Sequence, residues 1–289
     1  MDRISVVDKT VIASGLRALG LCAGDGVMVH SSLKSLGRVD GGPATVIAAL
    51  MEVLTAEGTL MMPSFNHAKI FEPDGPGIFD PKTTPTINGA IPDMFWRMPG
   101  VYRSMDPTHA FAAWGKNAER YIKSHHCTLT MGPDSPLGLL GREGGWVLLL
   151  GVGYNTNTYH HVVEMTTKAP CLGLRSDAYP VRLADGRIVS ARTWGWRNAT
   201  CPIDDTAIYS EELVRLGLER TAQIGLCHAK MFRASDCFDV VARLLREGYQ
   251  GCPPCSRCPI RPLKMAVTVE SDWDEQNNCL KPDSVGWTY

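Results

Sequence analysis

A histidine and a glutamate in the middle of the chain have the spacing of an acid–base pair. His161 and Glu164 are three residues apart in the segment 155–164, which directly follows the apolar run 146–153. On a helix this spacing places both side chains on one face, where the carboxylate can hydrogen-bond the imidazole, fix its tautomer and raise its basicity. The pair is therefore a candidate general base, and the competing interpretation is a solvated helix face or a helix cap.

The turn that precedes this pair is a suitable place for chemistry. In open α/β sheets, the carboxyl end of a buried strand faces the crevice where ligands bind. Thr158 and the backbone amides of this strand-to-helix turn are candidates for stabilising a developing oxyanion. No G-x-S-x-G motif or reactive-cysteine signature accompanies the site. If the reaction is a group transfer, this favours direct transfer between the two substrates over a covalent enzyme intermediate. His160 is predicted to face away from Glu164 and to fill space.

A second candidate strand end lies near the N-terminus. Residues 26–30 have the pattern of a short buried strand, and the loop 31–37 that follows is rich in small and hydroxyl side chains. Pro43 then stands at the first position of a predicted helix over 43–56. A loop of this kind can hold phosphate groups, whereas His30, at the end of the strand, is predicted to be structural.

Six short motifs follow one another along the chain in a fixed order. They are His30-Ser31-Ser32-Leu33 with Ser35 and Gly37, Met62-Pro63-Ser64-Phe65, Arg103-Ser104, Asp106 through His109 to Gly115, Gly132 through Pro136, and Thr158 through His161 to Glu164. In this order and at these distances they resemble the aminoglycoside 3-N-acetyltransferase family over roughly residues 10–250.

The resemblance implies an enzyme that transfers the acetyl group of acetyl-coenzyme A to the 3-amino group of an aminoglycoside-type antibiotic, and so a role in antibiotic resistance. It implies that His161 is the base that deprotonates the amine and that Glu164 orients it. It also implies that the loop after the first strand binds the pyrophosphate and pantetheine of the coenzyme. The loop residues concerned are Ser31, Ser32, Leu33, Ser35 and Gly37.

The chain departs from the family pattern where the substrate is expected. Asp106 stands where many members have His, Ala110 where they have Ser, and Asn155 where they often have Asp. Because an acidic residue attracts a polycationic antibiotic, Asn155 removes one attractive charge and Asp106 supplies another. Asp106, His109 and Asn155 are the predicted substrate-binding residues. For His109, a core or loop histidine bonded to backbone is the alternative.

Bulk composition restricts the classes of function. The 289 residues include 44% hydrophobic and 20% charged residues, and 29 basic against 30 acidic residues give a formal net charge of −1. This balance lacks the basic surface of a nucleic-acid binder. The N-terminus has no apolar signal segment and no run reaches the roughly 20 apolar residues that span a bilayer, so we expect a cytoplasmic protein without a membrane partner. Monomer and homodimer both stay open.

Alternating helix and strand patterns predict an α/β fold with a central mixed sheet and helices on both faces. Helices are predicted at 10–21, 43–56, 90–98, 117–124, 136–140 and 207–218, and strands at 26–30, 58–62, 110–114 and from 146. Residues 223–231 are predicted to be one extended segment, and Ser235 to cap a further helix.

Residues 1–250 are predicted to form the acetyltransferase domain, with two special segments. The segment 63–88 is rich in Pro, Gly and acidic residues and is assigned to the substrate side, with a plain surface loop as the alternative. Ala184-Asp185-Gly186 separates two alternating runs, which predicts an antiparallel hairpin in an insertion over 171–200.

Residues 251–289 are predicted to be a separate tail rich in cysteine and proline. Cys252, Cys255 and Cys258 have metal-thiolate spacing, but Pro262 stands where an iron–sulfur site would need a fourth cysteine. A zinc site completed by Cys279, a disulfide or an inert tail all stay open, and no metal is predicted. The other six cysteines are predicted to be small buried residues: Cys22, Cys127, Cys171, Cys201, Cys227 and Cys237. Two alternatives to the family activity are acyl transfer to a different small amine and a decayed enzyme with a metal-binding tail.

Overall fold

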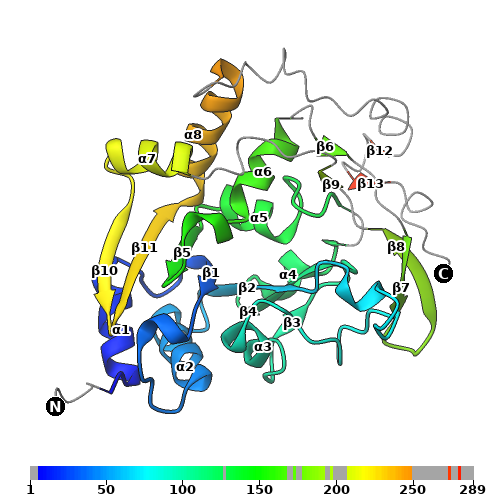
Figure 1. Ribbon diagram of the computed structural model, residues 1–289, viewed down its shortest axis with the longest axis horizontal. Helices are drawn as coiled ribbons and strands as arrows, with labels where there is room; N and C mark the ends of the chain where they lie inside the picture. The colour runs from blue at the N-terminus through cyan, green and yellow to red at the C-terminus, as the bar shows by residue number, and fades with distance from the viewer. Residues whose placement is uncertain are drawn as a thin grey trace.

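The computed structural model describes residues 6–125, 128–167, 172–173, 178–192, 196–197, 207–248, 273–274 and 279–280. Its centre is a seven-stranded mixed sheet (Figure 1). In spatial order the strands are β10 (Arg220–Ile224), β11 (Cys227–Arg233), β5 (Trp146–Leu150), β1 (Gly26–Ser31), β2 (Thr59–Phe65), β4 (His109–Gly115) and β3 (Tyr102–Arg103). The three central strands β5, β1 and β2 are parallel, and the outer strands pair antiparallel.

Helices cover both faces of this sheet, which confirms the predicted fold class. One face packs against α1 (Lys9–Ala18), α2 (Pro43–Leu54) and α3 (Ala90–Phe95). The other packs against α4 (Ala118–Ile122), α5 (Pro136–Arg142), α6 (Tyr159–Thr166), α7 (Ala207–Arg215) and α8 (Ala234–Glu247). Strand alternation divides the two cores, because Val27 and Val29 of β1 face the first layer and Met28 faces the second.

The predicted hairpin is present as β7 (Ala178–Arg182) and β8 (Ile188–Arg192). Gly186 in its turn has a φ of 88°, a conformation that glycine adopts without strain. The hairpin contacts the segment that follows β2: Phe79 N–H donates to Pro180 O at 2.9 Å, and the Phe71 and Tyr179 rings stack at 4.3 Å. The loop and the insertion therefore share a small third core around Phe79 and Val181.

Several expected boundaries are wrong. Pro63, Ser64 and Phe65 belong to β2, so the predicted loop begins only after them. Residues 223–231 are not one extended segment, because a turn at Gly225, with a φ of 60°, divides them between β10 and β11.

Two single-residue predictions are also wrong. The α8 helix begins one residue before Ser235, and its N-cap is Arg233, whose side chain makes no capping hydrogen bond. Cys22 is exposed in the turn after α1, whereas Cys227 and Cys237 are buried as expected. The predictions for Cys127, Cys171 and Cys201 fall outside the described residues.

Little of the C-terminal tail lies within the described residues. β12 (Trp273–Asp274) pairs antiparallel with β13 (Cys279–Leu280), and β6 (Leu172–Gly173) pairs with β9 (Trp196–Arg197) within the insertion. The Cys252, Cys255 and Cys258 motif falls outside them. Among the helices of the described ranges, none has the length and apolar composition needed to cross a lipid bilayer.

Candidate active site

Four segments from distant parts of the sequence converge at one edge of the sheet. The parallel strands β1, β2 and β5 all end there, as the directions of their pairing require. β4 runs antiparallel to β2 and pairs His109 with Phe65, so β4 begins at the edge where β2 ends. The loop after β1, the start of β4 and the β5–α6 turn are thus neighbours, as expected for the ligand-binding edge of an α/β sheet.

The hydroxyl-rich loop after β1 is fixed against the turn after β5. Ser32 N–H donates to Leu150 O at 3.0 Å, which extends the β1–β5 pairing, and Ser35 Oγ donates to Ser32 O at 2.7 Å. A side chain at Gly151, which has a φ of 73°, would collide with Ser35 Oγ. The predicted coenzyme loop is therefore compact before any ligand binds.

Leu33 and Gly37 complete this loop by packing rather than by hydrogen-bonding side chains. Leu33 packs against the core formed with α1 and α2. Gly37 has a φ of 87°, and a Cβ there would lie 3.1 Å from Leu226 at the β10–β11 turn. The Ser31 hydroxyl is buried and has no hydrogen-bond partner among the described residues. Coenzyme binding by these residues stays a prediction.

The turn between β5 and α6 is held by a buried asparagine that the sequence analysis missed. Asn157 Oδ1 accepts from Tyr159 N–H at 3.0 Å, and its Nδ2 donates to the Tyr209 hydroxyl of α7 at 3.1 Å. Thr158, the N-cap of α6, makes no capping hydrogen bond with its side chain. Its hydroxyl lies 3.4 Å from His30 Nε2, which links the β1 and β5 ends directly.

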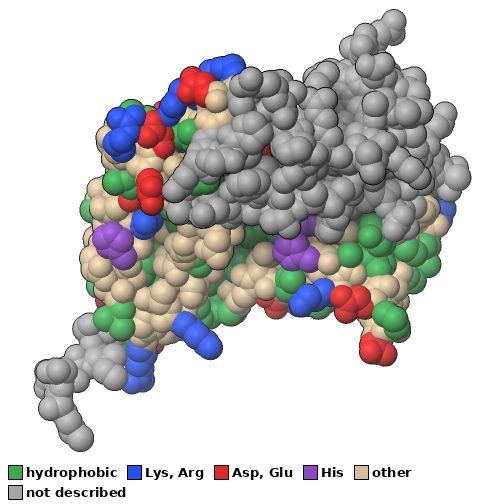
Figure 2. All heavy atoms as spheres, turned by 45° about the horizontal axis from the view of Figure 1, so that its top comes forward, with side chains coloured by type: hydrophobic (Ala, Val, Ile, Leu, Met, Phe, Trp, Pro, Cys, Tyr) green, Lys and Arg blue, Asp and Glu red, His purple; other side chains and the backbone are tan. Residues whose placement is uncertain are grey.

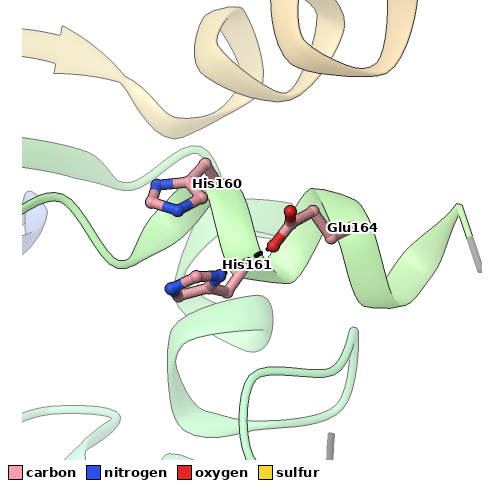
Figure 3. A group of neighbouring side chains, drawn as sticks. All are labelled: His160, His161 and Glu164. Atoms are coloured by element: carbon pink, nitrogen blue, oxygen red, sulfur yellow. Dashed lines mark hydrogen bonds and ion pairs between the residues drawn. The ribbon is translucent and has the colours of Figure 1, made fainter. Parts of the chain in front are cut away.

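The predicted acid–base pair is formed on α6. His161 Nδ1 lies 2.7 Å from Glu164 Oε2 (Figure 3). The Glu164 side chain is 0% exposed and that of His161 is 31% exposed, so a buried carboxyl group holds a ring that solvent can reach. A carboxylate only accepts, so the neutral ring carries its proton on Nδ1 and offers the Nε2 lone pair. Such a ring can accept a proton from a bound ligand.

His160 does not face away from Glu164, and that prediction is wrong. Its ring centroid lies 4.0 Å from that of His161, and a ring nitrogen lies within 4.8 Å of a Glu164 carboxylate oxygen. The Tyr209 hydroxyl lies 3.3 Å from His160 Nδ1. The His160 ring thus lies between Tyr209 of α7 and His161.

Asp106 is enclosed and holds the turn that leads into β4. Its carboxylate accepts from Thr108 N–H at 3.0 Å, from His109 N–H at 2.7 Å and from the Thr130 hydroxyl at 2.7 Å. Burial alone would raise its carboxyl pKa, but His125, His109 and the backbone donors together hold this pKa below its ordinary value. Contact between Asp106 and a substrate stays a prediction.

His109 lies at the start of β4 with its Nδ1 2.7 Å from the Thr108 hydroxyl. Burial lowers the pKa of His109 to about 3, against the opposing effect of Asp106. Electrostatic repulsion by His67 and His161 lowers the pKa of His109 further, so the three rings are close enough to influence one another.

His67 was not predicted as a site residue. Its ring meets the His109 ring edge-on at 4.8 Å, and its backbone φ is 48°, which is rare for a residue with a side chain. Unusual backbone conformations cluster at functional sites, but nothing in the sequence 66–68 predicts one. Histidine side chains are exposed near the middle of the face shown in Figure 2, with hydrophobic side chains beside them.

Asn155 lies on the same turn, within the 3-10 helix η4 (Tyr154–Thr156), and is exposed. Among the described cysteines, Cys227 of β11 and Cys237 of α8 are buried and are poor nucleophiles. Burial raises the pKa of Cys227 to about 11 and that of Cys237 to about 12. Both groups therefore stay protonated at neutral pH.

Comparisons with known proteins place this arrangement in one family. A family model described as aminoglycoside 3-N-acetyltransferase matches residues 28–246. The chain is 34% identical over 230 residues to aminoglycoside N(3)-acetyltransferase IV from Salmonella sp., covering 79% of this chain and 83% of that protein. It is 33% identical over 266 residues to aminoglycoside N(3)-acetyltransferase VII from Streptomyces paromomycinus, covering 83% and 92%.

Solved structures with similar folds include ligand complexes. The binary complex of AAC-IIIb with CoASH has a TM-score of 0.76 at 26% identity, covering 86% of this chain and 100% of that chain. A histidine-to-alanine mutant of AAC(3)-IVa in complex with a gentamicin has a TM-score of 0.73 at 30% identity, covering 89% and 98%.

Proposed function

The chain belongs to the aminoglycoside 3-N-acetyltransferase family, and we propose that it transfers the acetyl group of acetyl-coenzyme A to the 3-amino group of an aminoglycoside-type antibiotic. The observation that carries this proposal is the His161–Glu164 hydrogen bond of 2.7 Å at the sheet edge that also holds the hydroxyl-rich loop. The solved relatives with CoASH and with gentamicin support both ligand classes.

In this mechanism His161 acts as the general base. An ammonium group is not a nucleophile, so a proton must leave the substrate nitrogen as this nitrogen attacks the thioester carbonyl carbon. His161 Nε2 accepts the proton while Glu164 stabilises the imidazolium through Nδ1–H. The C–S bond then breaks, the departing sulfur receives the proton held by His161, and the second proton lost from the ammonium nitrogen is released to solvent, giving the amide and free coenzyme A.

Thr158 is the side-chain donor proposed for the oxyanion on the thioester carbonyl. Two backbone amides of its turn already have acceptors within the protein, because Tyr159 N–H donates to Asn157 Oδ1 and His161 N–H donates to Thr158 O. If His30 carries its proton on Nε2, it donates to the Thr158 oxygen, which leaves the Thr158 hydroxyl proton for the oxyanion. This assignment makes the His30 tautomer part of the mechanism.

The coenzyme is assigned to the loop after β1, with Ser31, Ser32, Leu33, Ser35 and Gly37 around its pyrophosphate and pantetheine. The internal bond from Ser35 to Ser32 makes Ser35 a residue that shapes the loop, whereas the buried Ser31 hydroxyl has a hydrogen bond to give to a ligand. We assign direct transfer, and the protonated state of the buried Cys227 and Cys237 thiols supports it.

The antibiotic is assigned to the side of the site formed by His109, Asp106 and Asn155. A neutral His109 can accept a hydrogen bond from an ammonium or hydroxyl group without repelling a polycation. Asp106 holds His109 in place through its backbone and adds a negative charge behind it. Asn155 supplies a neutral side chain at the exposed rim.

Acetyl transfer to a panel of aminoglycosides tests the proposal, with thioester consumption as the assay and mass spectrometry and NMR of the product to locate the acetyl group. We expect turnover with at least one aminoglycoside and acetylation at the 3-amino group. Turnover of another small amine, with no aminoglycoside turned over, would assign a different substrate class. Asn155, which stands where many relatives have an acidic residue, would be consistent with that result. Absence of both turnover and coenzyme A binding would indicate a decayed enzyme.

A further inference from the structure

Three potential metal ligands lie together on the first turns of α6. His160 and Glu164 are four residues apart and His161 and Glu164 are three apart, so Glu164 shares a helix face with each ring (Figure 3). One ligand atom from each of the three residues lies within 4.8 Å of the other two. Two imidazoles and one carboxylate are the protein ligands of many zinc sites that keep a position open for water.

We propose that His160, His161 and Glu164 form an inhibitory site for a divalent transition-metal ion, Zn²⁺ above all. Zinc bonds of about 2.0–2.2 Å at a tetrahedral angle hold neighbouring ligand atoms roughly 3.3–3.6 Å apart. The His161–Glu164 separation of 2.7 Å must therefore widen slightly, and His160 must move closer. His161, with 31% of its side chain exposed, has room to turn and gives the ion a way in.

The surroundings of His160 are suited to a metal ligand. Metal-binding histidines usually donate their second ring N–H to a fixed acceptor. The Tyr209 oxygen lies 3.3 Å from His160 Nδ1, and Asn157 Nδ2 holds that oxygen in place at 3.1 Å. With Nδ1–H bonded to Tyr209, His160 would bind the ion through Nε2. Glu164, buried at 0% exposure, supplies the negative charge that an ion requires in this position.

Metal binding would remove the base without touching a substrate. The ion takes the lone pair of His161 Nδ1, the nitrogen that faces Glu164, so the neutral ring must carry its proton on Nε2. Nε2 then has no lone pair for the proton of the substrate amine, and acetyl transfer stops. Inhibition rests on the function proposed above, but metal binding does not.

Cobalt binding to the full-length chain tests the site, because Co²⁺ in a tetrahedral nitrogen and oxygen site absorbs visible light. We expect one saturable equivalent without a sulfur-to-cobalt charge-transfer band. The Cys252, Cys255 and Cys258 motif could bind metal independently, so the titration is repeated with all three changed to serine. The visible spectrum should persist in that variant.

His160→Asn is the matched change, since an amide can keep the contact with Tyr209 but is a poor zinc ligand. We expect its metal affinity to fall by more than about tenfold, since losing even a partner that orients a ligand typically has an effect of 10–100-fold. His160→Gln serves as a second variant if the first does not fold, as judged by circular dichroism. The proposal would be overturned if cobalt binding is not saturable or if the spectrum shows thiolate ligands alone. Unchanged metal affinity in the folded His160→Asn variant would also overturn it.

Zinc inhibition of acetyl transfer provides the second measurement. The zinc concentration for half inhibition should match the binding constant and rise by more than about tenfold in His160→Asn, as the lost ligand requires. Equal inhibition of this variant and the wild type would overturn the proposal. If the wild type binds cobalt as expected but transfers no acetyl group, the metal site is supported and only the proposed function fails.

Discussion

Three histidines from two regions of the site differ in their access to solvent. On the sheet side, His30 at the end of β1 and His125 after α4 are buried. Burial lowers the pKa of His30 to about 3 and also lowers that of His125. On the helix side, His161 of α6 is 31% exposed and donates to a buried carboxylate. The same residue type is therefore enclosed at these two sheet-side positions and within reach of solvent at His161.

This difference teaches what each region can do. A buried ring can orient its neighbours, as His125 does between Ser104 Oγ and Thr130 O, both at 2.8 Å. A ring that reaches solvent and has a carboxylate partner can take up and release a proton. We therefore expect changes on the helix side to alter the rate of chemistry, and changes on the sheet side to alter positioning and stability.

The largest expected effect is that of His161→Ala. We expect kcat to fall by about 10²–10⁴-fold, the usual contribution of a general base, with little change in coenzyme A affinity. Steady-state kinetics and calorimetry with coenzyme A measure the two effects. His228→Ala removes an exposed histidine from β11 and serves as the matched control, with activity close to wild type. Full activity in His161→Ala would show that His161 is not the base and that the two regions do not differ in function as described.

Thr158 lies where the two regions meet, so its substitution should have the next largest effect. Thr158→Val removes the hydroxyl and should lower kcat by about 10²–10³-fold, the typical loss for one oxyanion donor. Thr158→Ser keeps the hydroxyl and should stay within roughly tenfold of wild type. If the two variants were equally active, the hydroxyl would have no part in the reaction, and the 3.4 Å contact with His30 would be structural.

The helix side of this comparison was largely predictable from the sequence, because its key contact is local. His161 and Glu164 meet through the geometry of one helical turn, and that geometry follows from their spacing alone. The strand positions were predictable for a similar reason, since continuous apolar runs such as residues 146–150 indicate strands buried on both faces.

Contacts between distant segments were not predictable in this way. Thr158 meets His30 across 128 residues, and Asn157 meets Tyr209 across 52. The orientation of His160 was mispredicted for the same reason, since it depends on Tyr209 of α7. Residues 223–231 have the pattern of a single strand because Ile224 and Cys227 are apolar, although Gly225 forms the turn between β10 and β11.

The sheet-side histidines should make stability depend on pH. Burial lowers the folded-state pKa of His30 to about 3 and also lowers that of His125, whereas in the unfolded chain each has a pKa near 6.5. As pH falls below about 6.5 the unfolded state binds protons that the folded state does not, so the unfolding free energy decreases, by up to about 1.4 kcal/mol per pH unit for each group. For His30 this continues down to about pH 3.

Urea unfolding between pH 5 and 7.5 measures this dependence. In His125→Asn, the slope of the unfolding free energy against pH should be smaller than in the wild type by the contribution of one histidine. This holds even if the variant is less stable at every pH. An unchanged slope in this variant would show that burial does not lower the pKa of His125 in the folded protein.

The smallest expected effect is that of His109→Asn, which tests whether a sheet-side histidine near the base takes part in proton transfer. Burial lowers the pKa of His109 to about 3, so its ring cannot exchange protons near neutral pH and is left to accept a hydrogen bond from substrate. We expect KM for the aminoglycoside to rise by about 2–10-fold, the value of one net hydrogen bond of 0.5–1.5 kcal/mol. The pH profile of kcat should be unchanged, because that profile belongs to the His161–Glu164 pair.

Asparagine can keep the contact with the Thr108 hydroxyl, and wild-type affinity for coenzyme A confirms that the site is intact. A shifted kcat profile in this variant would show that His109 titrates with the base, and the division between a neutral sheet side and a proton-exchanging helix side would then not hold.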